Sequence, residues 1–139
     1  MGLVYAEIEL INTYDLGMAL HGIIPESDVK RQKVNALVDS GAYMLAINEH
    51  VCQQLDLRKL NAQEMVLADG TLKKLDIVGP VDIRFKNRAT TVRAVVLPGQ
   101  NEILLGSIPM EDMDVLIDPK EQKLVVNPEN PYMAKKSLK

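Results

Sequence analysis

The residues best suited to chemistry in this sequence are Asp39, Ser40 and Gly41, which directly follow the apolar run at residues 36–38. An apolar strand that ends at a carboxylate fixes the position of that carboxylate by packing. Gly41 lets the backbone turn sharply and approach a neighbouring segment closely. All three residue types also form ordinary turns, so the tripeptide taken alone more often marks a turn after a strand. Its functional interpretation therefore depends on the elements around it.

The other groups that could do chemistry are isolated from one another. His21 and His50 have no further metal-binding residues at suitable spacing, so we expect no metal site. Cys52 has no neighbouring histidine, and a half-buried thiol is the favoured interpretation. The acidic residues at 111, 112 and 114 fit a solvated helix end, where the helix dipole favours negative charge. We expect no cofactor.

Alternating apolar residues predict several short strands. Residues 3–11 and 34–38 indicate strands on the N-terminal side of Asp39, and Asn48 is expected to cap a short helix that runs through about Leu55. The polar stretch between those two strands predicts a loose hairpin with a long loop. Asp69-Gly70 predicts a two-residue hairpin turn between strands at 65–67 and 72–78. Further predicted elements are strands at 81–85, 90–97 and 103–105, a helix over 107–114 with Ser107 as its cap, and a last hairpin at 115–117 and 123–126.

This pattern predicts a mostly-β domain with a closed, barrel-like sheet and one or two short helices, because no strand–helix–strand rhythm is present. We place the domain at residues 1–128. Residues 129–139 are expected to be a flexible tail, since prolines at 128 and 131 and terminal lysines follow the last predicted strand.

Residues 36–42, Ala-Leu-Val-Asp-Ser-Gly-Ala, resemble the active-site segment of the retropepsin-like aspartic proteases, in which Asp-Thr/Ser-Gly follows an apolar strand. Leu104-Leu105-Gly106 and the helix predicted after it resemble the family's supporting element around the catalytic loop. The hairpin at Asp69-Gly70 lies between the two, where the family has the flap that closes over substrate. The resemblance covers about residues 3–126 and implies a closed β-barrel of the retropepsin-like type.

The resemblance implies an aspartic endopeptidase whose catalytic segment is Asp39, Ser40 and Gly41. Two carboxylates that share one proton are needed, so that one can act as base on a water. The later aspartates lack the motif, namely Asp56, Asp69, Asp76, Asp82, Asp112, Asp114 and Asp118. The second carboxylate must then come from a second copy, which implies a homodimer. Ser40 is expected to hydrogen-bond across the dimer axis and hold the two loops in register.

Substrate contacts are expected from the catalytic loop and the flap. The predicted substrate-binding residues are Ala42, Ala68, Asp69 and Gly70, and Met44 and Ile108 are weaker candidates for the cleft wall. Leu104, Leu105 and Gly106 are expected to support the site. Residues 3–10 and 123–126 are candidates for the dimer interface.

Composition limits the partners. The balance of 16 basic and 19 acidic residues gives a net charge of −3, without the basic stripe of a general nucleic-acid binder. We expect a peptide or protein substrate, no nucleic acid and no membrane partner, since no apolar run approaches about 20 residues. A single cysteine and no visible secretory signal predict a cytoplasmic protein. Two alternatives stay open: a non-proteolytic module of the same fold for dimerisation or peptide binding, and an unrelated β-rich scaffold.

Overall fold

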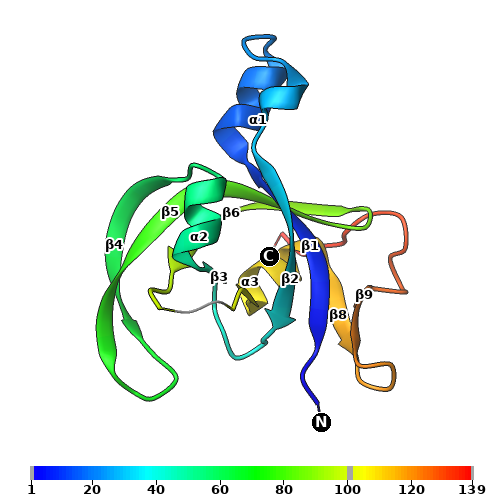
Figure 1. Cartoon of the computed structure of the whole chain (residues 1–139). Helices are drawn as coiled ribbons and strands as arrows, with labels where there is room; N and C mark the ends of the chain where they lie inside the picture. The colour runs from blue at the N-terminus through cyan, green and yellow to red at the C-terminus, as the bar shows by residue number, and fades with distance from the viewer. Residues whose placement is uncertain (1, 100–101, 139) are drawn as a thin grey trace.

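The structure is a computed structural model in which residues 2–99 and 102–138 are described. The strands in this part of the chain are β1 (Tyr5–Asn12), β2 (Arg31–Val38), β3 (Leu45–Ile47), β4 (Arg58–Val66), β5 (Leu72–Phe85), β6 (Arg88–Val96), β7 (Leu104–Leu105), β8 (Val115–Asp118) and β9 (Lys123–Val126) (Figure 1). The helices are α1 (Thr13–Leu20), the short 3-10 helix η1 (Glu26–Asp28), α2 (Glu49–Gln54) and α3 (Ser107–Met113). No helix within the described ranges is long and apolar enough to cross a membrane.

The main sheet closes on itself. Its strand order is β1-β2-β7-β3-β6-β5-β4, and an additional pairing of β1 with β5 completes a ring that leaves β4 outside. Side chains at alternate positions fill the interior, as the two-residue period of a strand requires. Ile8, Leu10 and Ile83, for example, are at most 1% exposed. The predicted mostly-β domain with a closed sheet is confirmed.

The segment between β1 and β2 is not the loose hairpin that the sequence predicts. It forms α1 and η1, which project as an arm beyond the ring (Figure 1). Asn12 caps α1, because its Oδ1 accepts a hydrogen bond of 3.1 Å from the Asp15 backbone N–H. Its Nδ2 donates to the carbonyls of Leu55 at 2.8 Å and Asp56 at 3.3 Å. Gly17 inside α1 weakens the helical pattern, and this is why the sequence conceals the helix.

Asn12 therefore joins the base of the arm to the end of α2, and its loss has a measurable cost. We expect Asn12→Ala to lower the free energy of unfolding by about 2 kcal/mol, because a helix cap, a buried hydrogen bond and a part-buried one disappear together. Urea unfolding followed by circular dichroism measures the change. Asn35→Ala is the control, since Asn35 is exposed on β2. Equal stability of the two variants would contradict the assigned role.

The two predicted helices are present, but only one has the predicted cap. Asn48 caps α2 as expected, since its Oδ1 accepts from the Val51 backbone N–H at 2.8 Å. Ser107 was wrongly predicted as the cap of α3, because it is the first helical residue and Gly106 is the N-cap. Gly106 has no side chain to cap the helix, so the free N–H groups at this end must find acceptors elsewhere.

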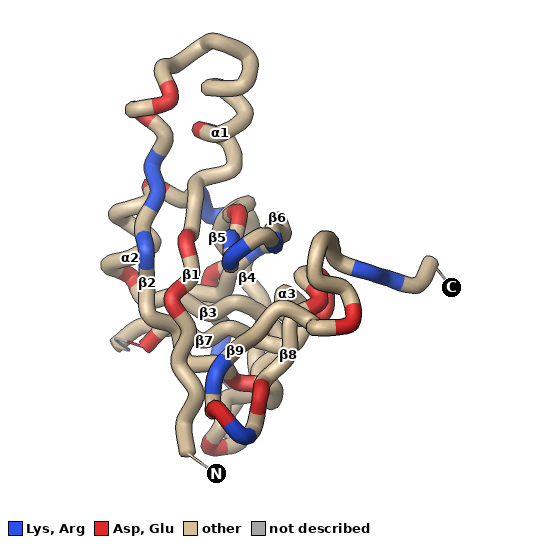
Figure 2. Tube along the Cα trace, turned by 90° about the vertical axis from the view of Figure 1, so that its right-hand side faces the viewer, with Lys and Arg blue, Asp and Glu red and all other residues tan. Residues whose placement is uncertain are grey.

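The predicted last hairpin is confirmed as the separate two-stranded sheet of β8 and β9. After β9 the chain folds back onto Asp114, whose carboxylate accepts hydrogen bonds from three tail groups. These donors are Asn127 Nδ2 at 3.0 Å, Asn130 Nδ2 at 2.8 Å and the Lys135 backbone N–H at 3.0 Å. Figure 2 shows the basic stretch of this tail beyond α3, close to the C-terminus. The domain limit at residue 128 and a flexible tail stay predictions, and these contacts weigh against the second.

Hydrogen bonds from Asn127 and Lys135 hold the pKa of Asp114 below its ordinary value. Stability from the ionised carboxylate is therefore fully present above the unfolded-state pKa of about 4, and it is lost as the pH falls through the lower folded-state pKa. We expect Asp114→Asn to lower the urea midpoint at pH 7, with a difference from wild type that shrinks below about pH 4. Asparagine tolerates the left-handed backbone of this position, with φ 55° and ψ 53°. A difference in urea midpoint that does not change with pH would contradict the conclusion that the ionised Asp114 carboxylate stabilises the fold.

Candidate active site

Asp39 lies where strand β2 ends, and packing around the strand fixes its position. β2 and β7 run parallel, with Leu37 opposite Leu104 and Val38 opposite Leu105. The Asp39 backbone N–H continues this pairing with a bond of 3.0 Å to the Leu105 carbonyl. Leu105 is fully buried, so the catalytic candidate rests on a rigid element of the core.

The loop that follows turns back on the Asp39 side chain. The Gly41 backbone N–H donates to Asp39 Oδ1 at 2.9 Å, and the Ala42 N–H donates to the Asp39 carbonyl at 3.1 Å. A Cβ on Gly41 would lie 3.2 Å from Asp39 Oδ1, which is tighter than ordinary contact. Glycine at this position thus leaves the carboxylate room to keep its orientation. Asp39 is partly exposed, and Ser40 and Gly41 are exposed.

Gly106 joins the catalytic loop to α3. The first N–H groups of α3 donate to the loop's carbonyls, Ser107 to Ala42 at 2.8 Å and Ile108 to Tyr43 at 3.1 Å. These carbonyls accept hydrogen bonds from the N–H groups that a capping side chain would otherwise bind. A Cβ on Gly106 would lie 2.4 Å from the Met44 carbonyl oxygen, a distance that real Cβ atoms do not reach. The close contact between loop and helix therefore requires glycine.

The hairpin of β4 and β5 reaches over the cleft, and its tip differs from the prediction. A two-residue Asp-Gly turn is wrong, because the Leu67 N–H bonds the Thr71 carbonyl at 2.8 Å around a three-residue loop. Gly70 has a φ of +85°, whereas Asp69 stays at negative φ. Asp69 Oδ1 instead accepts from the Thr71 hydroxyl at 2.7 Å and the Thr71 N–H at 2.9 Å. These bonds lower the pKa of Asp69 and order the tip.

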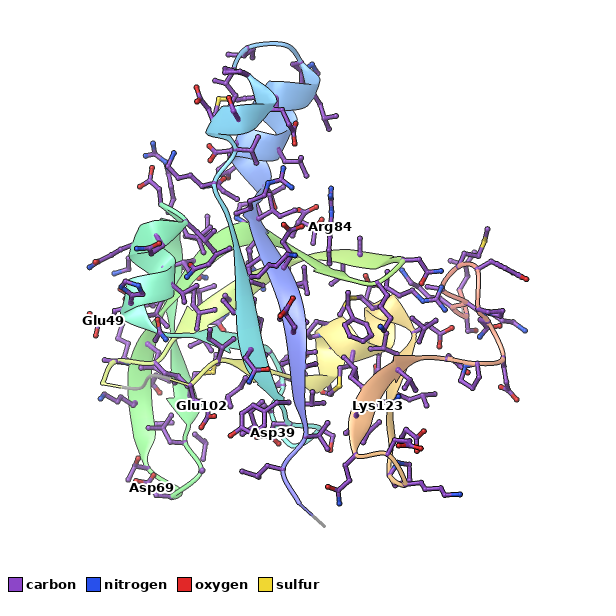
Figure 3. All side chains as sticks on the ribbon, turned by 45° about the vertical axis from the view of Figure 1, so that its right-hand side comes forward. Asp39, Glu49, Asp69, Arg84, Glu102 and Lys123 are labelled. Atoms are coloured by element: carbon purple, nitrogen blue, oxygen red, sulfur yellow. The ribbon has the colours of Figure 1, made fainter. Side chains whose placement is uncertain are left out.

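A cleft of about 660 Å³ lies between the catalytic loop and this hairpin. Figure 3 shows Asp39 after the end of β2 and Asp69 at the tip of the hairpin, both in the lower part of the view. Apart from Asp39, Asp69, Lys73 and the phenol of Tyr43, the side chains that line it are apolar or absent. The structure thus brings together a carboxylate, an apolar wall and a two-stranded hairpin around one cleft.

The predicted site residues divide into two groups. Those that line the cleft are Asp39, Gly41, Ala42, Met44, Ala68, Asp69 and Leu104. Ser40, Gly70, Leu105 and Gly106 lie next to lining residues without lining it themselves, and the last two are buried behind the loop. Ile108 was wrongly placed in the cleft wall, because α3 turns its side chain to the outside, where it is 41% exposed. The catalytic and binding roles of all these residues stay predictions.

Part of the cleft wall was not predicted from the sequence. The residues concerned are Tyr43, Ala46, Met65, Val66, Leu67, Lys73, Leu75, Val95, Leu97 and Pro98. Alternation along β5 groups Lys73 and Leu75 on one face with Ile77, a partial signal that does not say whether this face meets the cleft. The β6 residues carry no such signal, since which face of that strand meets the cleft depends on the closure of the ring.

The histidines, the cysteine and the acidic residues at 111, 112 and 114, for which the sequence indicates no catalytic role, do not line this cleft. Cys52 lines a smaller hollow of about 350 Å³ between α2 and the base of the β4–β5 hairpin. Burial raises the pKa of its thiol, as do the nearby carboxylates of Asp76 and Asp56. A protonated thiol is a poor nucleophile. Across the described residues, no cluster of three or more His, Cys, Asp or Glu side chains could hold a metal ion.

Comparison with known proteins identifies a family with this arrangement. The family model described as "gag-polyprotein putative aspartyl protease" matches residues 26–118, which include the catalytic segment, the hairpin and α3. Among solved structures, EIAV protease in complex with the inhibitor HBY-793 aligns with a TM-score of 0.59 and 17% identity, over 84% of this chain and 93% of that one. No curated protein matches the sequence. The chain therefore has the retropepsin-like fold and belongs to the family of gag-polyprotein aspartyl proteases.

Proposed function

We propose that this chain is an aspartic endopeptidase that works as a homodimer, with one Asp39 from each subunit. The observation that supports it most is the position of Asp39 at a cleft of about 660 Å³, with one oxygen fixed by the Gly41 N–H at 2.9 Å. The other lining carboxylate among the described residues, Asp69, is tied to Thr71 at the hairpin tip. A second Asp39 related by a two-fold axis supplies the missing partner.

Two Asp39 carboxylates placed face to face cannot both ionise, so the pair holds one proton and titrates as a unit. The ionised member takes a proton from a water molecule, which attacks the carbonyl carbon of the scissile peptide bond. The protonated member donates to the carbonyl oxygen and stabilises the tetrahedral intermediate. Collapse of the intermediate, with proton transfer to the amine nitrogen, releases two peptides. The β4–β5 hairpin closes over the substrate and excludes bulk water.

Exposed apolar side chains around the catalytic loop support a second copy at this face. Leu3 is 70% exposed, Tyr43 71% and Ile108 41%. Tyr43 and Ile108 lie close together, because the Tyr43 carbonyl accepts a hydrogen bond from the Ile108 N–H. Leu3 precedes Val4, whose carbonyl accepts from the N–H of Val38, the residue before Asp39. We place Ser40 and Ala42 at the same face, where Ser40 hydrogen-bonds across the axis and Ala42 contacts the substrate backbone. Residues 3–10, which include most of β1, and strand β9 remain the proposed interface segments. A cytoplasmic location is also part of the proposal, consistent with the single free Cys52.

The test is incubation of the folded protein with a mixed peptide library between about pH 3 and pH 7, the region where paired carboxylates titrate. Mass spectrometry identifies the cuts, and light scattering measures the molar mass of the particle. Cleavage by a dimer is the expected result. An intact library in the presence of a folded dimer would favour the non-proteolytic module, and a monomer that cleaves would contradict the shared dyad.

A further inference from the structure

Lys73 is the one cation among the described residues that line the cleft. It lies on β5 opposite Met65 of β4, on the strand face that also presents Leu75. The next residue, Lys74, points to the other face and lines the separate hollow beneath α2. Two consecutive lysines thus have opposite surroundings, because successive side chains of a strand alternate between its faces.

The Lys73 ammonium has no acidic partner in the described part of the chain. The ion pairs between described residues involve Lys30, Arg31, Lys59 and Lys136, and none of these pairs includes Lys73. The two acids of the cleft are engaged elsewhere, Asp69 with Thr71 and Asp39 with the Gly41 N–H. A positive charge that faces an apolar cleft without a counter-charge attracts an anionic group from outside.

We propose that Lys73 makes this cleft selective for peptides with an Asp or Glu side chain near the scissile bond. The inference rests on the proposed protease function and names its substrate class. Lys73 lies opposite Met65 and on the same strand face as Leu75, and its exposed side chain lines the cleft, so its stem can cover apolar surface while the ammonium stays in water. Ion pairing there is strengthened by the apolar wall, in which water screens charges less than at an open surface.

A dimer would have two Lys73 side chains, one from each hairpin and related by the two-fold axis. An extended substrate crosses that axis at the scissile bond, so it meets one Lys73 on each side. Acidic residues are therefore accepted on either side of the cut, at positions that the hairpins cover. The apolar wall receives the side chains between them.

The experiment compares matched peptides that differ by a single Glu-to-Gln change on one side of the cut site. At pH 6 and low salt we expect kcat/KM for the Glu peptide to exceed that for the Gln peptide by about fivefold, the range of a partly exposed ion pair. The preference should shrink in 1 M salt and below about pH 4, where screening and protonation of the peptide's Glu remove the attraction. Lys73→Glu should reverse the preference, so that a Lys peptide becomes better than a Glu peptide. Lys74→Glu, with the same change of charge on the opposite face, should leave the Glu preference intact.

Binding of the same peptides to Asp39→Asn protein, measured by fluorescence anisotropy, separates this inference from the proposed function. Cleavage without a Glu preference, or a preference that Lys74→Glu changes as much as Lys73→Glu, would overturn the inference alone. Selective binding of Glu peptides by a wild-type protein that cleaves nothing would support the inference and overturn the protease. Equal binding of Glu and Gln peptides, or binding of neither, would overturn the inference whatever the activity.

Discussion

Asp39→Asn should abolish peptide cleavage, with a loss in kcat of about a thousandfold or more, because general acid and general base disappear together. In a homodimer one substitution removes both carboxylates of the dyad. Asparagine keeps an Oδ1 that can accept the Gly41 N–H, a bond of 2.9 Å in the wild type, so the loop is expected to retain its shape. Peptide cleavage assayed by liquid chromatography measures the loss.

The same substitution should leave the dimer intact or tighten it, since association no longer requires the paired carboxylates to take up a proton. Sedimentation of both proteins measures this. Asp28→Asn is the matched control, because Asp28 is exposed in η1, on the arm. It should cleave as wild type does. Residual cleavage by Asp39→Asn above a few per cent of wild type would mean that another group activates the water.

Gly106→Ala should destabilise the fold by about 3 kcal/mol, the cost of forcing a methyl group into a filled space. The new Cβ would lie 2.4 Å from the Met44 carbonyl oxygen and 2.9 Å from the Ala42 carbonyl oxygen. Both atoms are backbone and cannot rotate away, so α3 and the catalytic loop must separate. The φ of Gly106 is −89°, which any residue adopts, and the cost is therefore steric alone. Because the displaced loop holds Asp39, activity should fall with stability.

Gly17→Ala is the matched control for Gly106→Ala, and its effect on the free energy of unfolding should have the opposite sign. Nothing lies within 4 Å of a Cβ at Gly17, which sits inside α1. Alanine there should stabilise the protein by about 0.5–1 kcal/mol through its higher helix propensity. Chemical denaturation of both variants measures the two effects. If Gly106→Ala were as stable as wild type, the loop and α3 would not be packed as described.

Local patterns in the sequence were sufficient to predict most strands and the catalytic candidate. The alternation at residues 3–11 and the apolar run before Asp39 correspond to β1 and β2, because strand periodicity depends on which face is buried. Asn48 and the Asp69-Gly70 pair indicated a helix start and a hairpin, each from the chemistry of one or two residues. These signals are local, so a single sequence contains them.

Other features depend on contacts between distant segments. The turn at Asp69 is wider than predicted, and Thr71 donates a local hydrogen bond to the Asp69 side chain. The residue that caps α1, Asn12, is also held by a hydrogen bond to the carbonyl of Leu55, the C-cap of α2. The identity of the α3 cap was missed because the acceptors are backbone carbonyls more than sixty residues earlier in the sequence. Propensity does not encode such pairings.

The sequence by itself determined the candidate catalytic carboxylate, the order of loop, hairpin and helix, and the mostly-β class. Only the tertiary structure decided what surrounds that carboxylate. It showed that Lys73 rather than Lys74 faces the cleft, that Ile108 does not, and that Gly106 permits no side chain. The physical reason is that a strand pattern gives two faces without saying which one meets the substrate. That choice is made when β1 pairs with β5 and closes the ring.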